Sequence, residues 1–456
     1  MTLVSTRVRV YAEGVTKRIV IAGGGFGGFY AARALERIST TRGVRVTLVN
    51  DANFMLYTPL LPGAAGATLD PRHVVVPLRS QLRRTELLIG SVMGADPESR
   101  VLRVCRIDGE RLELAYDQLL VALGSVSRTL SVPGLAEHAI GLKSLSDATA
   151  LRNQILTCLD IAESLEDPVR RAEYLGFVFV GAGYAGLEGL AELQDFAAQA
   201  IELYPRCRAE GMRWVLVEAR ERIMPEAPAS LSAFAARELL GRGIEINTNR
   251  TLTAVTQGGA TLSSGELLAA RTVVWTAGVR PSPVVASLGL PSGDDGRIVV
   301  DRELRVEGRQ GVWAIGDCAA VPDPARRGRT CPPTAQHAIR QGRLAAHNIA
   351  AALECRPARP FRYRTAGMVA ELGHNKAVAI TLGVRWRGLP AWLIARTYHL
   401  LLMPGLGRKL RLLMDWNVAL LFGRDTSSPG RLGSATSLQF AEDEELAHVP
   451  RPVGVS

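Results

Sequence analysis

The stretch KRIVIAGGGFGGFYAA, residues 17–32, decides the fold. Its apolar run ends at a cluster of glycines, and an alanine-rich segment with a helical pattern follows. Gly23, Gly25 and Gly28 have the G-x-G-x-x-G spacing that joins strand to helix in a dinucleotide-binding βαβ unit. Such glycines let the backbone approach a pyrophosphate, and the free N–H groups of the helix start receive its charge. The stretch predicts a nucleotide site; a glycine turn that only packs a helix on a strand is the alternative.

A second glycine turn lies in the middle of the chain. The apolar strand 175–180 runs into GAGYAGLE, which repeats the spacing at Gly181, Gly183 and Gly186. The next apolar strand ends in Glu218, where such units carry an acidic residue for the ribose 2′-hydroxyl. Two turns of this kind, each with its strand and helix in order, predict two separate nucleotide sites.

The two units differ at the residue that would bind the ribose. A carboxylate at Glu218 repels a 2′-phosphate and therefore favours NADH over NADPH, although the nearby Arg220 and Arg222 weaken this preference. In the first unit Asn50 stands where the acidic residue is usual, and Asp51 follows it. Because an amide can also hydrogen-bond a hydroxyl, either residue could serve there.

Composition indicates a folded protein of two or three domains, since 47% of the 456 residues are hydrophobic. The 54 basic residues outnumber the 44 acidic ones, which favours an anionic partner such as a membrane, a phosphate-rich ligand or a nucleic acid. No two of the six cysteines have C-x-x-C or zinc-ligand spacing, so we expect reduced thiols, a cytosolic compartment and no metal site. Residues 1–14 lack the apolar core of a signal peptide, and no apolar run is long enough for a spanning helix.

Three shorter motifs accompany the glycine turns. The apolar strand 118–122 leads into Ala-Leu-Gly-Ser, where Gly124 lets the chain pass close to a bound cofactor. A later strand ends in Gly-Asp, with Asp317 at its end. Two prolines then precede Thr334, which is placed to cap a helix predicted over residues 335–353.

The order of these motifs resembles the two-dinucleotide-binding-domain flavoprotein family over roughly residues 17–425. Within it the chain most resembles the type II NADH:quinone oxidoreductases, which do not pump protons. The segments that carry this resemblance are YTPLLP (57–62), TLDPRHVVVPLR (68–79), TAQHAIRQG (334–342) and GHNKAVA (373–379).

The resemblance implies an α/β fold with two Rossmann-like domains, one for FAD and one for NADH, followed by a C-terminal amphipathic membrane-associating region. The NADH-binding domain is expected as an insertion in the FAD-binding domain. The implied parts are 16–145 and 279–355 for FAD, 146–278 for NADH, and 356–456 for the membrane-associating region with a flexible tail.

The resemblance also implies roles for individual residues. The FAD ligands would be Gly23, Gly25, Gly28, Asn50 or Asp51, Gly124, Asp317 and Gln336. The NADH ligands would be Gly181, Gly183, Gly186 and Glu218. Glu188 would lie by the nicotinamide, its alternative being a helix-dipole partner in the first helical turn. Catalytic residues would be Glu188 and Gln336, and the quinone would meet Gln336, Arg340 and Gln341. Arg340 departs from the family pattern A-Q-x-A-x-Q-Q, which has glutamine there.

The implied reaction is hydride transfer from NADH to flavin N5, followed by two electrons to a membrane quinone. The helix opening at residue 335 would direct its positive end at the flavin pyrimidine edge and stabilise the reduced flavin. No cysteine pair lies near residues 50–60, which argues against a disulfide reductase. His337 and His374 are more readily structural than chemical. The alternatives are a soluble NADH-dependent reductase of an iron–sulfur protein and a non-catalytic flavin- or NADH-sensing module.

The segment 385–424 predicts contact with a lipid surface. It contains seven basic residues against the single acidic residue Asp415. Two helices are expected there, over residues 391–403 and 406–422, and the second has leucines on one face and charges opposite. Basic amphipathic helices of this kind suit an interfacial anchor on an anionic leaflet, here the cytoplasmic side of the cell membrane. Packing on the core or a homodimer contact is the alternative, and no nucleic-acid partner is expected.

Overall fold

The computed structural model describes residues 7–8, 17–38, 43–365 and 367–428. The chain divides into two units, residues 1–424 and 425–456. The sheets and helices all belong to the first unit. Residues 429–456 of the predicted tail, which include the acidic run at 442–445, lie outside the described residues.

The first sheet forms around the opening strand, β2 (Lys17–Ala22), which pairs in parallel with β3 (Val44–Asn50) and β9 (Gln118–Val121). Parallel pairing continues from β3 to β6 (Glu86–Asp96) and from β9 to β21 (Val312–Ala314). Continuously apolar strands suit a parallel sheet, which is covered on both faces. The outer strands of this sheet are β7 (Val101–Arg106), β8 (Arg111–Ala115) and β1 (Arg7–Val8).

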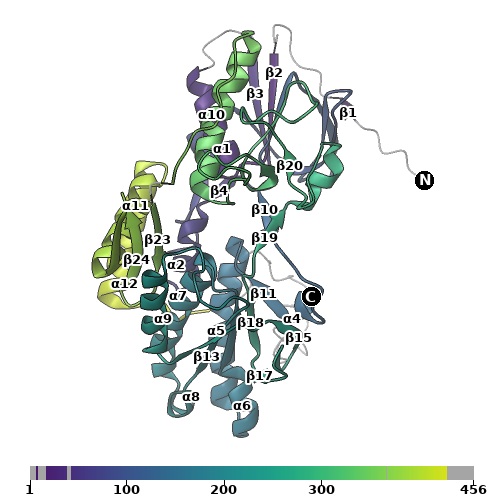
Figure 1. Ribbon diagram of the computed structural model, residues 1–456. Coiled ribbons are helices and arrows are strands. Elements are labelled where there is room, and N and C mark those ends of the chain that lie inside the picture. Colours follow the sequence, from purple (N-terminus) through teal and green to yellow (C-terminus); the bar gives the residue numbers. More distant parts are fainter. Residues whose placement is uncertain (1–6, 9–16, 39–42, 366, 429–456) are drawn as a thin grey trace, which may run out of the picture. The chain divides into compact units, whose positions relative to one another are not determined.

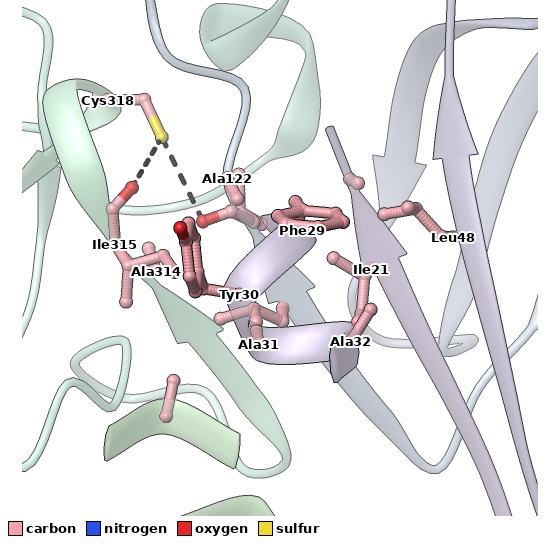
Figure 2. Packing of buried hydrophobic residues seen from close by; sticks show 14 of the residues in the cluster. Ile21, Phe29, Tyr30, Ala31, Ala32, Leu48, Ala122, Ala314, Ile315 and Cys318 are labelled. Atoms are coloured by element: carbon pink, nitrogen blue, oxygen red, sulfur yellow. Dashed lines mark hydrogen bonds between the residues drawn. The ribbon is translucent and has the colours of Figure 1, made fainter. Parts of the chain in front are cut away.

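Two helices cover one face of this sheet, α1 (Phe26–Ile38) and α10 (Ala335–Leu353), and they lie side by side in Figure 1. A Cβ at Gly342 of α10 would come within 2.2 Å of the Gly27 carbonyl oxygen in α1, so this contact requires glycine. Phe29 of α1 packs on Ile21 and Leu48 of the sheet (Figure 2). The first glycine turn is thereby fixed between strand and helix.

The second sheet is parallel throughout and has the order β11 (Ala139–Gly141), β18 (Thr272–Trp275), β12 (Gly176–Val180), β13 (Arg213–Glu218), β14 (Ile244–Thr248). The chain leaves the first sheet at β9 and returns to it at β21 only after this second sheet is complete. The antiparallel pair β10 (Ser125–Ser127) and β19 (Val279–Pro281) lies at the two crossings. The α/β fold with an inserted second sheet is therefore present, while the exact domain boundaries stay a prediction.

Helices and a small sheet complete this inserted region. The main helices are α5 (Leu145–Ser164), α7 (Tyr184–Ala200) and α9 (Ala229–Leu240). The antiparallel strands are β15 (Leu252–Thr256), β16 (Gly259–Leu262) and β17 (Leu267–Ala269). The shorter elements of the unit are β4 (Phe54–Leu56), η1 (Thr58–Leu60), α2 (Leu61–Ala65), β5 (Val75–Pro77), α3 (Leu78–Gln81), α4 (Leu135–His138), α6 (Pro168–Tyr174), η2 (Ile201–Leu203), α8 (Pro205–Glu210), η3 (Pro283–Leu288), β20 (Ile298–Val299), η4 (Gly316–Cys318) and β22 (Ala319–Ala320).

The C-terminal part begins with an antiparallel sheet of β23 (Gly367–Glu371), β24 (Ala377–Thr381) and β25 (Val384–Gly388). Two helices follow, α11 (Leu389–Leu402) and α12 (Leu406–Phe422), close to the predicted ranges. Figure 1 shows α11 beside this sheet. Among the described residues, no helix has both the length and the apolar character needed to cross a bilayer.

Candidate functional site

The first glycine turn has one open position between two crowded ones. Gly23 has a φ of +103°, and a Cβ there would lie 2.4 Å from the carbonyl oxygen of Ala122. A Cβ at Gly28 would lie 1.8 Å from the carbonyl oxygen of Gly23. Gly25, between them, has no atom within 4 Å of its Cβ position. The outer glycines thus pack the turn, and the middle one leaves space at the start of α1 for a phosphate.

The second turn has the same construction. Gly181 has a φ of +100°, and a Cβ at Gly186 would lie 2.1 Å from the Gly181 carbonyl oxygen. Gly183 is open, with no atom within 4 Å of its Cβ position. Both turns therefore leave open space beside a helix start, as a pyrophosphate group would require.

Asn50 and Asp51, the two residues proposed for the first ribose, differ in their surroundings. Oδ1 of Asn50 accepts a 2.7 Å hydrogen bond from the N–H of Gly24, and Nδ2 donates to the carbonyls of Ala52 (2.8 Å) and Phe54 (3.3 Å). The Asn50 amide thus braces the loop, whereas the following Asp51 is exposed. The Asp51 carboxylate is therefore accessible to a ligand.

The carboxylate of Glu218 binds the second glycine turn as the Asn50 amide binds the first. Its oxygens accept hydrogen bonds from the N–H groups of Ala182 (2.7 Å) and Arg220 (3.0 Å). Arg222 donates to the carbonyls of Ala227 and Pro225, so its guanidinium serves the loop. The Arg220 side chain, by contrast, is exposed.

Asp317 is held at the end of β21 by two side chains that sequence reasoning did not connect with it. Its Oδ2 accepts a 2.6 Å hydrogen bond from Ser125, whose hydroxyl in turn accepts one of 3.1 Å from Lys143. The adjacent Gly316, with a φ of +71°, donates its N–H to Oε1 of Gln341 at 2.8 Å. Gln341 is 1% exposed, and its amide oxygen braces this turn.

Gly124 lies in an open loop, whereas the Cys318 thiol is buried. Gly124 has a φ of +65° and no atom within 4 Å of its Cβ position, which leaves room for a cofactor. Cys318 is buried, and its thiol donates to the carbonyl of Ile315 at 3.3 Å (Figure 2). Burial raises the pKa of this thiol to about 11, so it stays protonated and unreactive. All six cysteines are unpaired, as expected.

The start of α10 is capped as predicted. The Thr334 hydroxyl accepts from the N–H of His337 at 3.4 Å and lies 2.7 Å from its Nδ1. Burial lowers the pKa of His337, which favours the neutral imidazole. His337 is therefore part of the cap.

The residues expected to meet a quinone form a cluster with a tyrosine that the sequence motifs did not include. The Tyr363 hydroxyl donates a 2.6 Å hydrogen bond to Oε1 of Gln336. The guanidinium of Arg340 lies over the Tyr363 ring, 4.0 Å from its centroid, and donates to the Gln336 carbonyl at 3.0 Å. Arg340 thus replaces an amide with a cation that is fixed on an aromatic face.

Glu188 lies in the second turn of α7, so its alternative role as a first-turn dipole partner is wrong. Its Oε1 accepts a 3.0 Å hydrogen bond from the N–H of Glu371 in β23. Burial raises the pKa of Glu188 to about 8, and it also raises the pKa of Glu371. Arg396 of α11 faces Glu371 at 4.0 Å. A small cavity of about 20 Å³ lies among these groups and the YTPLLP segment.

A cavity of about 670 Å³ lies elsewhere, at the amino ends of β9 and β21. Its lining residues include Gln118 and Val312, which begin those strands. Cofactors of doubly wound sheets bind at the carboxyl ends of the strands, where both glycine turns lie. The larger cavity is therefore not the nucleotide site.

Comparison with known proteins agrees with this geometry. Residues 17–342 match the family model of the pyridine nucleotide-disulphide oxidoreductases. The chain is 32% identical over 422 residues to the type II NADH:quinone oxidoreductase Ndh of Mycobacterium tuberculosis, with 89% of each chain covered. It is 29% identical over 421 residues to a probable NADH dehydrogenase of Dictyostelium discoideum, covering 90% of this chain and 91% of that one.

Among solved structures, NDH2 from Plasmodium falciparum in complex with NADH shares the fold, with a TM-score of 0.83. The identity is 18%, over 90% of this chain and 99% of that one. The family match and the curated relatives together place the sequence: the chain belongs to the pyridine nucleotide-disulphide oxidoreductase family and, within it, to the type II NADH:quinone oxidoreductases.

Proposed function

We propose that the protein uses bound FAD to oxidise NADH and passes two electrons to a membrane quinone, without pumping protons. The observation that carries this proposal is the pair of glycine turns on two parallel sheets, each open at its middle residue, Gly25 and Gly183. The relative from Mycobacterium tuberculosis is named as an oxidoreductase of NADH and a quinone. FAD supplies the hydride acceptor at N5, and the protein positions and tunes it.

The residues present fit FAD in the first sheet. The open Gly25 and the N–H groups at the start of α1 receive the pyrophosphate, and the exposed Asp51 binds the adenosine ribose. Asp317, fixed by the Ser125 hydroxyl at 2.6 Å, binds hydroxyls of the ribityl chain. Gly124 leaves space beside the cofactor. The capped start of α10, at Gln336, presents partial positive charge to the flavin pyrimidine edge.

The second sheet holds NADH in this proposal. Gly181, Gly183 and Gly186 form the pyrophosphate turn, and Glu218 binds the ribose diol. The carboxylate at this position disfavours NADPH. Glu188 lies by the nicotinamide, where its raised pKa keeps much of it protonated near neutral pH and avoids a buried negative charge beside the reacting ring.

The quinone site is formed by Gln336 and Arg340. The Gln336 amide is oriented by the Tyr363 hydroxyl, and the Arg340 cation can stabilise negative charge that develops on a quinone oxygen. Gln341 was expected to contact the quinone, but it is buried against Gly316. We therefore assign Gln341 a positioning role through the Gly316–Asp317 turn.

The C-terminal helices are the membrane-binding surface of this proposal. The buried side chains of α12 are Leu412 and Trp416, whereas its apolar face points outward. The exposed apolar residues of the two helices include Leu393, Leu401, Leu406, Leu410, Leu413, Met414, Val418, Leu420, Leu421 and Phe422. An exposed apolar patch of this kind, in a segment that carries seven basic residues, fits the interface of an anionic leaflet. We place the protein peripherally on the cytoplasmic side; a homodimer through the same face is the other outcome.

Steady-state NADH oxidation with a short-chain quinone and with an iron–sulfur protein, side by side, tests the proposal. Quinone-dependent turnover that far exceeds turnover with the iron–sulfur acceptor is expected. Fast oxidation confined to the iron–sulfur acceptor would instead identify a soluble reductase, and flavin reduction without turnover of either acceptor would identify a sensing module.

A further inference from the structure

His399 is a buried imidazole with an unsatisfied nitrogen. It lies on α11 and is 6% exposed, and its Nδ1 is buried without a hydrogen-bond partner among the residues that the structure describes. A buried polar atom left without a partner destabilises a fold by roughly 1–3 kcal/mol. A side chain kept at this cost points to a ligand that satisfies it.

The imidazole is part of an aromatic chain that leads to the first glycine turn. The Tyr57 ring meets His399 edge-to-face, with 6.0 Å between the ring centroids. The other side of Tyr57 packs on Phe26, at 5.4 Å, and Phe26 is the first residue of α1 after the open Gly25. His399 is therefore joined, through two rings, to the end of the first sheet where the flavin is expected.

A second chain leads from His399 to the proposed quinone site. Its neighbour Tyr398 packs on it at 5.3 Å between centroids. Arg340 and Tyr363 act electrostatically on the Tyr398 hydroxyl, whose pKa burial raises. The same two residues hold Gln336. His399 is thus linked through Tyr57 to the first glycine turn, and through Tyr398 to the residues that would face the quinone.

We propose that Nδ1–H of His399 donates to one carbonyl oxygen of the bound quinone and delivers a proton to it. This inference rests on the proposed function, which supplies the two electrons. The Nδ1–H bond breaks as the O–H bond of the quinol forms, and Nε2 takes up a proton from water at the same time. The imidazole changes tautomer and remains neutral, and the second quinone oxygen receives its proton separately.

The environment of His399 suits a neutral relay. Burial lowers its pKa to about 4, so the side chain carries no charge at neutral pH. The rings packed on it, Tyr57 and Tyr398, also have raised pKa values because they are buried, and they stay protonated. A neutral imidazole has one donor and one acceptor nitrogen, which is what a tautomeric relay requires.

The test separates the two half-reactions of the purified, flavin-loaded protein. In His399→Gln a donor remains but the relay is lost, and in His399→Phe both are lost. We expect reoxidation of the reduced flavin by a short-chain quinone to slow by about 10²-fold in both variants, the usual contribution of a general acid. Bleaching of the flavin by NADH, and turnover with ferricyanide, which takes electrons without protons, should stay at wild-type rates.

His347→Gln is the matched control, because His347 is exposed on α10. It should behave as wild type in every assay. Quinone reoxidation at the wild-type rate in both His399 variants would overturn the proposal, as would an equal loss in the NADH half-reaction, which would show a structural or flavin-binding role. If the proposed function itself were wrong, the reduced flavin of the wild-type protein would not be reoxidised by quinone at all. That result differs from both outcomes for the His399 variants.

Discussion

The N–H of Ala182 donates a 2.7 Å hydrogen bond to Glu218, and the first sheet repeats this relationship with Gly24 and Asn50, also at 2.7 Å. In each sheet, a side chain at the end of one strand accepts a hydrogen bond from the glycine turn that follows the neighbouring strand. Asn50 at the end of β3 binds the turn after β2, and Glu218 at the end of β13 binds the turn after β12. The amide of Asn50 uses its remaining atoms on the loop, whereas the carboxylate of Glu218 keeps accepting capacity for a ribose. The Glu218 carboxylate is therefore expected to contribute directly to NADH binding.

Glu218→Ala should raise the KM for NADH by roughly tenfold or more, because hydrogen bonds from ribose hydroxyls to a charged acceptor are each worth about 1.5–3 kcal/mol. Glu218→Gln should raise it less, since an amide oxygen still accepts from Ala182, and should improve the use of NADPH because the charge is gone. Initial-rate kinetics with both nucleotides measure this, with the exposed Glu221→Gln as control. An unchanged KM in Glu218→Ala would remove Glu218 from the NADH site.

Gln341→Ala should destabilise the protein and weaken FAD retention together. The substitution leaves the half-buried N–H of Gly316 without its 2.8 Å partner, at a cost of about 1 kcal/mol or more, and frees the turn that carries Asp317. Urea unfolding and flavin content after gel filtration measure the two effects. Gln257→Ala, on an exposed hairpin, should change neither. Normal FAD retention in a clearly destabilised Gln341→Ala protein would refute the positioning role.

Glu188 should make the folded state less stable as pH rises. Burial raises its pKa to about 8, whereas the unfolded carboxyl titrates near its ordinary value. Between roughly pH 4 and pH 8 the unfolded chain therefore loses a proton that the folded protein keeps, so this group lowers stability progressively across that range. Glu188→Gln should show a smaller fall of Tm over the same range, measured by thermal unfolding at several pH values. Parallel curves for the two proteins would contradict the assignment.

Membrane association should depend on the outward face of α12. Leu420 and Leu421 are 65% and 73% exposed, so their joint replacement by glutamate removes apolar contact without opening the core. Flotation with anionic liposomes should show loss of binding, while NADH–ferricyanide turnover stays normal. Ile107→Glu is the control, because Ile107 is 80% exposed and lies in a hairpin far along the chain from α12. Retained liposome binding would exclude this face, and a wild-type dimer that the double variant dissociates would assign the face to subunit contact.

Deletion of the C-terminal region is a poorer experiment than these point substitutions. Leu412 and Trp416 of α12 belong to the hydrophobic core of the first sheet. Arg424 donates to the carbonyls of Gly66 and Glu192, each at 2.7 Å, and its side chain is 8% exposed. Truncation after about residue 385 would therefore damage the folded unit as well as its surface.

The sequence predicts the parts of the site that depend on local geometry. Gly23 and Gly181 need positive φ values, and Gly28 and Gly186 need close packing, so their spacing alone identifies both turns. Partners brought together by tertiary folding have no such signal. Tyr363 is 27 residues from Gln336, and Glu371 is 183 residues from Glu188. The burial of Gln341 likewise depends on how α10 packs, which a motif does not reveal.

Rapid mixing of the two half-reactions shows directly whether the reduced flavin passes its electrons to a quinone. The flavin of the purified wild-type protein is reduced with one equivalent of NADH under anaerobic conditions and then mixed with a short-chain quinone or with an oxidised iron–sulfur protein. We predict that the quinone reoxidises the flavin at a rate sufficient for steady-state turnover and that the iron–sulfur protein reoxidises it far more slowly. Reduced flavin that persists in the presence of quinone and is reoxidised only by the iron–sulfur protein would contradict the account.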